Sequence, residues 1–347
     1  MTFYFLLHLV QKLQKVSLKN LVTLVKPSGR CITSVIKANI MSFPLLASTF
    51  ANNLLPILLL SSAGFILGKA FSVDSRTIGR VVFYIFAPML VFDLLVQNDL
   101  KLEEAVTVMA FTGTLILIMG IITLIIALAL KLERRILLSV LITTMFGNTG
   151  NYGLPVVSFA FGEEALKYAG LYFVTTSILF NTVGILIASL GHMTFKEAMF
   201  GLLRVPTVYG GILAALINTF HIELPTALTR TIDLAAGGSI PLMIVLLGIE
   251  LSRVQWSNSL RGVGLSVSLR LLAAPLIGLL LCLPFGLQGE VRQAGVLQGS
   301  MPAAVNTTIL AAEYQLDSSL VTAIVFIGTL LSPLTLTPLI VLLGKWS

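Results

Sequence analysis

Long apolar segments follow one another along this chain from Asn52 onward, with short polar loops between them. An α-helix needs about 20 apolar residues to cross the hydrocarbon core of a bilayer. Because that core offers no water, the backbone groups of each crossing segment must be satisfied within a helix. With 56% hydrophobic and 11% charged residues among 347, the chain is too apolar for a soluble domain of this length. The sequence therefore predicts an all-α polytopic membrane protein.

The apolar segments predict ten transmembrane helices, five in residues 50–190 and five in residues 204–344. The expected segments are 52–71, 80–96, 105–130, 136–162, 168–190, 205–220, 232–251, 260–283, 291–312 and 320–343. The fourth and the ninth are interrupted by glycine, proline and asparagine. These two segments are predicted to be discontinuous helices.

Residues 146–155, with the sequence FGNTGNYGLP, interrupt the fourth segment. Three glycines and a proline so close together do not hold a regular helix. Backbone groups freed at that depth are tolerated only where they are buried in protein or line a wet cavity. The half-helix that starts near Asn151 directs the positive end of its dipole into the break, and the asparagine amides offer uncharged donors. This arrangement suits a carboxylate or another small anion.

The two sets of five segments share landmarks at a separation of about 153 residues. Residues 86–90 (FAPML) correspond to 239–243 (SIPLM), and the first break corresponds to 299–308 (GSMPAAVNTT). An odd number of spans in each half places the second half upside down relative to the first. Paired interruptions in inverted repeats are the best sequence indication of a transporter binding site. We expect the two breaks to cross near the midplane of the membrane.

The basic residues of the short loops predict the orientation, because they favour the cytoplasmic side. One side carries Lys69, Arg76, Arg80, Lys131, Arg134, Arg135, Lys196, Arg204, Arg253 and Arg261, and the other carries Lys101, Lys167, Arg230, Arg292 and Lys345. The first set is predicted to be cytoplasmic. Both ends of the ten-span body then face outward.

Residues 1–40 form a basic N-terminal extension without acidic residues, and they supply six of the 22 basic residues. The rest of the chain is close to neutral, so the formal net charge of +7 indicates no nucleic-acid role. The extension is interpreted as dispensable or as the product of an upstream start codon. A membrane-surface anchor and a targeting segment are the alternatives. Removal of residues 1–40 is expected to leave transport intact.

Charged residues inside or near the spans need a partner or a task, because charge is costly in hydrocarbon. Arg270 lies well inside the eighth span, where it either attracts an anionic substrate or has a structural role, in an ion pair or by snorkelling. Asp93 and Asp233 lie near span ends, and they are candidates for binding a coupling ion, Na⁺ or H⁺, or are simply interfacial. Glu250 precedes Arg253 at helical spacing, which predicts a surface ion pair.

Residues 147–155, together with 328–338 (GTLLSPLTLTP), resemble the auxin efflux carrier family, whose bacterial branch is commonly described as malate or malonate permeases. The similarity covers roughly residues 52–344. It implies two inverted five-helix repeats, with helices 4 and 9 discontinuous and crossed, as in bile-acid-type symporters and NhaA-like proteins. It also implies a scaffold domain, a transport domain and elevator-like alternating access, and members are often homodimers.

In plant members of that family, asparagine and proline at the crossover bind the substrate carboxylate. The resemblance implies the same role for Asn151 and Pro155 in the first break, and for Asn306 and Pro302 in the second. This chain lacks the long central loop of the plant proteins, which argues against recognition of indole acids.

The predicted function is a secondary carrier of small organic anions, with an anion channel or a transporter-like sensor as the alternatives. The predicted substrate-binding residues are Asn148, Asn151, Tyr152, Pro155, Pro302, Asn306, Thr307 and Arg270. Paired aspartates or histidine-rich spans are absent from the sequence, which argues against an intramembrane enzyme and against a metal site. Beyond a coupling ion, no cofactor is expected.

Overall fold

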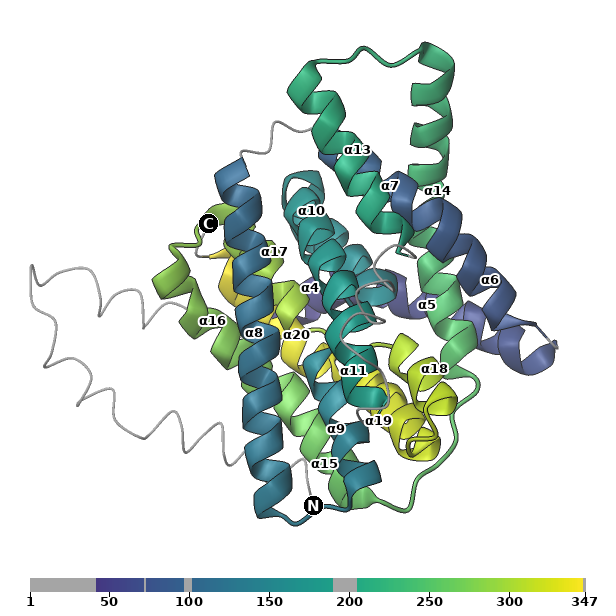
Figure 1. Ribbon diagram of the computed structural model, residues 1–347, viewed down its shortest axis with the longest axis vertical. Helices are drawn as coiled ribbons and strands as arrows, with labels where there is room; N and C mark the ends of the chain where they lie inside the picture. The colour runs from purple at the N-terminus through teal and green to yellow at the C-terminus, as the bar shows by residue number, and fades with distance from the viewer. Residues whose placement is uncertain (1–41, 72, 97–101, 190–204, 346–347) are drawn as a thin grey trace, which may run out of the picture. The chain divides into compact units, whose positions relative to one another are not determined.

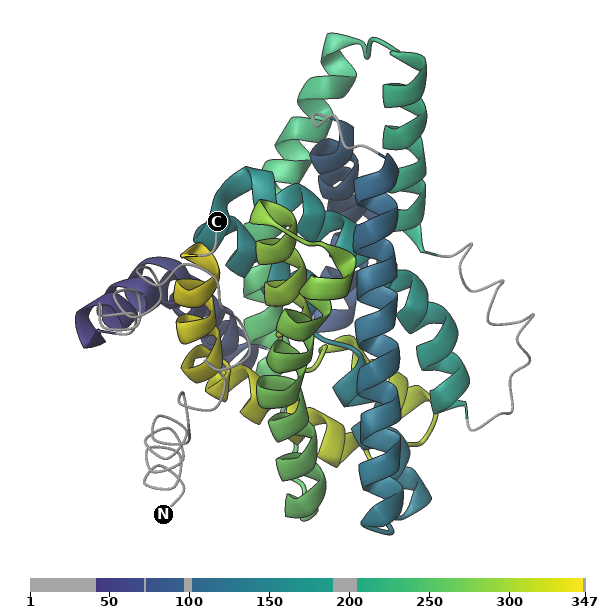
Figure 2. The ribbon, with the colours of Figure 1, turned by 90° about the vertical axis from the view of Figure 1, so that its left-hand side faces the viewer.

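The computed structural model describes residues 42–71, 73–96, 102–189 and 205–345, which form helices and loops (Figures 1 and 2). The α-helices are α4 (Phe43–Thr49), α5 (Leu55–Ala70), α6 (Ser75–Val81), α7 (Ala87–Val96), α8 (Leu102–Ala129), α9 (Arg134–Met145), α10 (Leu154–Leu179), α11 (Ile185–Ala188), α13 (Pro206–Phe220), α14 (Thr226–Leu251), α15 (Leu260–Ser268), α16 (Ala274–Phe285), α17 (Gly289–Gly299), α18 (Asn306–Glu313), α19 (Ser318–Leu331) and α20 (Pro333–Gly344). No β-strand occurs in these ranges. The predicted N-terminal extension, residues 1–40, lies outside them.

In the part of the chain that the structure describes, five π-helical turns interrupt the α-helices: η1 (Phe50–Leu54), η2 (Val82–Phe86), η3 (Thr149–Gly153), η4 (Phe180–Gly184) and η5 (Leu269–Ala273). In all but η4, a proline follows two residues after the turn, at positions 56, 88, 155 and 275. Proline lacks an N–H group and its ring clashes with the carbonyl four residues earlier. A wider turn before the proline relieves that clash. The sequence thus fixes where these helices widen.

Among the described residues, six helical segments are long and apolar enough to cross a membrane, and a bent pair, α19 and α20, makes a seventh if it is one span. These are residues 43–70, 75–96, 102–129, 149–188, 226–251 and 260–285, with the pair bent by 49°. The chain is therefore a multi-pass membrane protein. The shorter helices α9, α13, α17 and α18 occupy the other predicted segments, and the ten-span count stays a prediction.

Helix α14 packs against α5, and α13 packs against α7. Glycines allow the close approach of these helices. A Cβ at Gly248 of α14 would lie 1.8 Å from the carbonyl oxygen of Ser61, and one at Gly210 of α13 would lie 2.5 Å from that of Pro88. Contacts between backbones fix the helices against each other. We call α5, α6, α7, α13 and α14 the first helix group.

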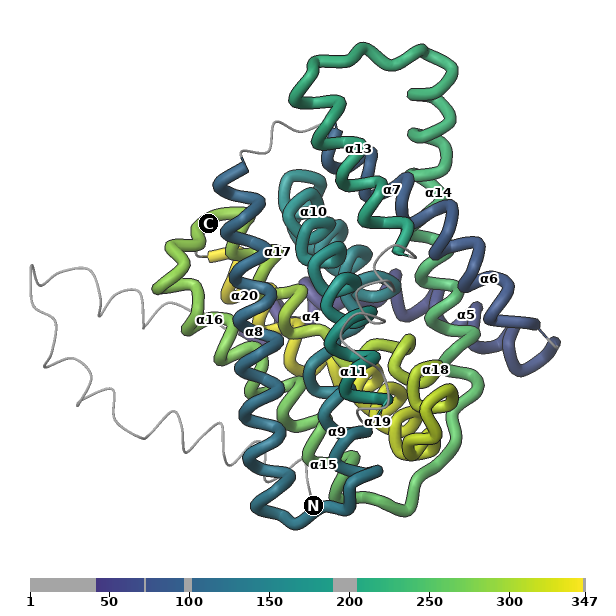
Figure 3. The backbone as a smooth tube through the Cα atoms, in the orientation of Figure 1, coloured from purple at the N-terminus to yellow at the C-terminus, as the bar shows by residue number. Residues whose placement is uncertain are grey.

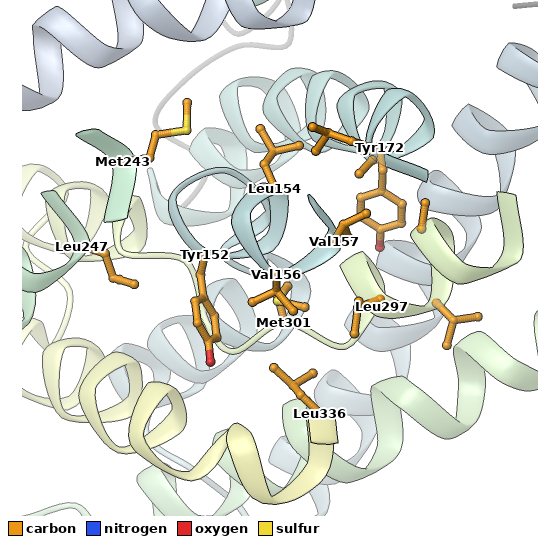
Figure 4. Close-up of a cluster of buried hydrophobic side chains, with 14 of the residues drawn as sticks. Tyr152, Leu154, Val156, Val157, Tyr172, Met243, Leu247, Leu297, Met301 and Leu336 are labelled. Carbon is orange, nitrogen blue, oxygen red and sulfur yellow. The ribbon is translucent and has the colours of Figure 1, made fainter. Parts of the chain in front are cut away.

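Helices α8, α9, α10 and α15 to α20 pack mainly among themselves, and we call them the second helix group (Figure 3). Helix α10 lies against α17 and α8, and α15 lies against α9 and α19. Figure 4 shows a cluster of buried apolar side chains that includes members of both groups, among them Tyr152 of η3, Leu336 of α20 and Leu247 of α14. Packing of these side chains places η3 beside α14.

One hydrogen bond joins two residues that the predicted repeat treats as equivalent. The Ser239 hydroxyl donates to the carbonyl oxygen of Phe86 over 3.0 Å, across a sequence separation of 153 residues. Equivalent residues meet in this way when they lie on a twofold axis. The contact supports the inverted repeat, which stays a prediction.

Candidate functional site

The two breaks cross and are joined by backbone hydrogen bonds. The N–H of Asn148 donates to the carbonyl oxygen of Pro302 (2.7 Å), and the N–H of Ala304 donates to that of Phe146 (3.0 Å). Gly147 and Ala303 form an isolated antiparallel bridge between these bonds. The interrupted helices thus satisfy some of their freed backbone groups on each other, as a break within a membrane requires.

Arg270 holds the crossing from its buried side. Its side chain is 3% exposed. Its Nε donates to the carbonyl oxygen of Met301 (2.7 Å) and its Nη1 to that of Thr144 (3.3 Å). Helix α9 ends at Met145 and α17 at Gly299, so these carbonyls lie where helix partners are lost. The guanidinium satisfies them, and within the described ranges it forms neither the ion pair nor the snorkelling contact considered from the sequence.

Two glycines of the crossing lie against the ends of long side chains, which occupy the space that a Cβ would take. An ideal Cβ at Gly147 would lie 1.8 Å from Nη2 of Arg270. An ideal Cβ at Gly153 would lie 2.1 Å from Oε1 of Gln298. Arg270 therefore lies directly behind the Gly147 backbone.

A cavity of about 920 Å³ lies in front of the crossing. Residues 146–151 of the first break and 304–306 of the second form part of its wall, and α6, η4 and the end of α14 form other parts. Five charged side chains also line it: Arg76, Arg80, Glu250, Arg253 and Glu313. Three positive charges face two negative ones. This balance favours an anionic occupant at long range.

Asp74 begins α6 and thereby positions two of these arginines. Its carboxylate accepts from the Thr77 hydroxyl (2.6 Å) and from the N–H of Arg76 (3.1 Å). These two hydrogen bonds lower the pKa of the exposed Asp74 carboxyl below its usual value of 3.8, and the bond from Thr77 has the larger effect.

Three predicted asparagines, Asn148, Asn151 and Asn306, line the cavity at the crossing. Asn148 is 5% exposed, and its side-chain Nδ2 is buried without a hydrogen-bond partner in the described part of the chain. Asn151 is half-buried in η3, and Asn306 is exposed at the start of α18. The N-terminal ends of η3 and α18 lie at the same wall and add their positive dipole ends.

The other residues predicted at the breaks lie behind this wall. Tyr152 is fully buried, and its hydroxyl lies 3.1 Å from that of Ser332. Pro155 is buried in the first turn of α10. Pro302 is buried, and its carbonyl oxygen accepts from Asn148. Thr307 is buried and donates to the carbonyl oxygen of Ala304 over 2.5 Å. None of the four lines the cavity.

The acidic residues singled out in the sequence lie in different places. Asp93 of α7 and Asp233 of α14, the two coupling-ion candidates, do not line the cavity. The expected ion pair of Glu250 with Arg253 is wrong. A guanidinium nitrogen of Arg253 donates to the carbonyl oxygen of Val73 instead, and Oε2 of Glu250 is buried without a hydrogen-bond partner in the described residues.

Sequence reasoning missed several polar residues of the site. Thr176, Ser177 and Asn181 line the cavity from the fifth predicted span. Gln298 is fully buried behind it, and its Nε2 donates to the carbonyl oxygens of Thr149 (3.2 Å) and Ala169 (3.3 Å). Polar amides in the middle of apolar segments were the signal that could have identified Asn181 and Gln298.

The model of a family described as membrane transport protein matches residues 49–200 and 190–340. The chain belongs to this family. It is 30% identical over 294 residues to an uncharacterized transporter of Methanothermobacter thermautotrophicus, covering 81% of this chain and 94% of that protein. It is 26% identical over 283 residues to a putative malonate transporter of Rhizobium meliloti, covering 76% and 85%.

A shorter match relates this chain to a plant protein. Over 148 residues the chain is 27% identical to a probable auxin efflux carrier component 5b of Oryza sativa, covering 41% of this chain and 40% of that protein. The resemblance to the auxin efflux carrier family is thereby confirmed.

Proposed function

We propose that this protein is a secondary carrier of small organic anions, and that it binds a carboxylate at the crossing of the two breaks. The observation that carries the proposal is the buried, unpartnered Nδ2 of Asn148 on the cavity wall. A buried amide donor without a partner is costly, and an anion in the cavity would satisfy it. Asn151 and Asn306 lie on the same wall and would add donors without a charge to desolvate.

The charge distribution supports an anion rather than a neutral substrate. The cavity is lined by three arginines and two glutamates, and the positive dipole ends of η3 and α18 point to it. Arg270 adds a fixed positive charge behind Gly147, where it attracts an anion without touching it. The similarity to a putative malonate transporter supports a mono- or dicarboxylate.

We further propose elevator-like alternating access, in which the second helix group moves against the first. The cavity is lined by both groups, as a site at a moving boundary would be. An orientation with both ends of the body outward, in a prokaryotic cell membrane, and a homodimer remain part of this proposal.

Thermal unfolding of the purified protein tests the substrate class, because a ligand that binds the folded state raises the unfolding temperature. The panel contains malonate, malate, an indole acid and the amide of each acid, with and without sodium. Stabilisation by an acid and not by its amide is the expected result. Asn151→Ala is expected to lose this stabilisation while its own unfolding without ligand stays unchanged.

No stabilisation by any acid would contradict the carboxylate site and favour the sensor. Flux through protein-containing liposomes distinguishes a carrier from an anion channel, since a carrier saturates and exchanges labelled for unlabelled substrate. Conductance without saturation would favour the channel.

A further inference from the structure

Glu250 is a cavity residue to which the proposed anion site assigns no role. It lies one residue before the end of α14, inside a helix long and apolar enough to cross a membrane. Its Oε2 is buried and accepts no hydrogen bond from the described part of the chain. Arg253, three residues later, donates to the carbonyl oxygen of Val73 instead. A buried carboxylate oxygen without a donor is costly, so Glu250 needs another partner.

The charged groups around Glu250 decide what that partner is. Arg76 and Arg80 of α6 and Glu313 of α18 line the same cavity, and Arg253 acts on Glu250 electrostatically. The other elements packed against α14 also carry titratable groups, but none of these groups lines the cavity. They are Lys69 of α5, Tyr84 of η2, Asp93 of α7, Tyr152 of η3, and Glu163, Glu164, Lys167, Tyr168 and Tyr172 of α10. Helix α19 has no titratable group.

A metal cation does not fit these surroundings. Three arginines share the cavity with Glu250 and repel a cation. The described residues also contain no group of three His, Cys, Asp or Glu side chains that could hold a metal ion. A proton, in contrast, needs only the one oxygen, and it removes the buried charge.

We propose that Glu250 is a proton-binding site of this transporter, and that it is protonated whenever an organic anion occupies the cavity. The inference rests on the proposed function. The proton comes from a hydronium ion in the cavity water: one O–H bond of the hydronium ion breaks as one O–H bond forms on the Glu250 carboxylate, and the hydronium ion becomes water. Release of the anion allows the proton to return to water.

Proton and anion then favour each other's binding. A carboxylate at Glu250 repels an anion in the same cavity, and protonation removes that repulsion. The coupling is reciprocal, so the anion also raises the affinity of Glu250 for the proton. If both are carried across together, the protein is a proton–anion symporter. Rising pH removes the proton and weakens anion binding.

Calorimetry of malonate binding to the full-length purified protein tests the coupling. The heat of binding is measured in two buffers of different ionisation enthalpy, from neutral to alkaline pH, where both malonate carboxyls are ionised. Wild-type protein is expected to take up a proton with malonate, and its affinity is expected to fall about 5-fold to 100-fold as pH rises. Glu250→Gln mimics the protonated state, so it is expected to bind malonate without proton uptake and independently of pH.

Glu313→Gln is the matched control, because Glu313 is exposed and lines the same cavity. It is expected to keep both the proton uptake and the pH dependence. Glu250→Ala is a second neutral variant if the glutamine variant unfolds. In liposomes, an inward proton gradient is expected to drive malonate accumulation by wild-type protein and not by Glu250→Gln, which still exchanges malonate.

Malonate binding to wild-type protein without proton uptake would overturn the inference and leave the proposed function standing. Proton uptake by Glu250→Gln equal to that of wild type would also overturn it. A sodium requirement that Glu250→Gln abolishes would replace the proton with a metal cation. If no carboxylate binds to wild-type protein at any pH, the proposed function fails and the inference with it.

Discussion

Helix α14 contacts its neighbours in two different ways. On the α5 side, backbone meets backbone: a Cβ at Gly248 would lie 1.8 Å from the carbonyl oxygen of Ser61. On the η3 side, the buried side chains are Met243 and Leu247 of α14 and Tyr152 of η3 (Figure 4), and no hydrogen bond joins α14 to η3 in the described residues. Contacts between backbones fix a register, whereas apolar side chains slide without exposing polar groups to hydrocarbon.

In the proposed elevator movement, helices α5 and α14 would form one body, and the crossing that Arg270 contacts would belong to the other. The boundary between the two bodies would be the η3 side of α14, and the cavity is lined from both sides of it. The following substitutions test the two kinds of contact, from the largest expected effect to the smallest.

Arg270→Met is expected to have the largest effect, because it removes the donors that hold the second body together. The carbonyls of Thr144 and Met301 would stay buried without these partners, at about 1–3 kcal/mol each. The free energy of unfolding should fall by about 2–6 kcal/mol in denaturant titrations. Arg261→Met, an exposed position on α15, is the control and should change it by less than about 0.5 kcal/mol. Equal stability of the two variants would show that Arg270 does not hold the crossing.

Gly248→Ala tests the contact between backbones in the first body. The new Cβ would meet the backbone of Ser61 and Phe65, so α5 and α14 must separate. We expect a loss of about 1–3 kcal/mol in the free energy of unfolding. Gly237→Ala, on the same helix, meets nothing within 4 Å and should be neutral or stabilising, because alanine favours a helix. A stable Gly248→Ala variant would mean that α5 and α14 are less tightly joined than the structure indicates.

Asn148→Ala tests the open side of the crossing, in the cavity between the two bodies. It should weaken carboxylate binding about 10-fold to 100-fold, the value of one hydrogen bond to a charged group, and leave the unfolding temperature unchanged. Asn181→Ala is the control, because Asn181 lines the same cavity but its Nδ2 already donates to the carbonyl oxygen of Ser177. A titration of ligand-induced stabilisation compares the two. Wild-type affinity in Asn148→Ala would exclude Asn148 from the site.

Leu247→Met tests the boundary and is expected to have the smallest effect. The volume is conserved and no polar group is involved, so the cost should stay below about 1.5 kcal/mol. The exchange rate of substrate in liposomes should stay close to that of wild type. A large loss of rate with intact stability would indicate that the η3 side of α14 fits one conformation closely and does not slide.

Several features of the fold were predictable because they depend on local sequence. The two breaks follow from glycine and proline, whose backbone limits act within a few residues. Antiparallel pairing of Gly147 with Ala303 agrees with the expectation that the breaks cross. The asparagines at the cavity wall were predictable as candidates, because buried amides in an apolar segment need a partner or a ligand.

The directions of the side chains were not predictable. Tyr152 stands one residue after Asn151, yet its side chain packs in the apolar interior while Asn151 lines the cavity. Glu250 and Arg253 have the spacing of an ion pair, but the arginine reaches a carbonyl group near the start of α6. Which partner a long side chain binds depends on the groups that the packed structure places around it.

The sequence by itself determined that this chain is a multi-pass helical membrane protein and located its two interrupted segments, because hydropathy and backbone restrictions are properties of each segment alone. Only the tertiary structure decided that Arg270 donates to backbone carbonyls on one side of the crossing and that the buried Asn148 amide, on the cavity wall, has no partner in the described residues. The physical reason is that a buried polar group is satisfied by whatever donor or acceptor the fold brings within about 3 Å, and that partner lies far away in the sequence.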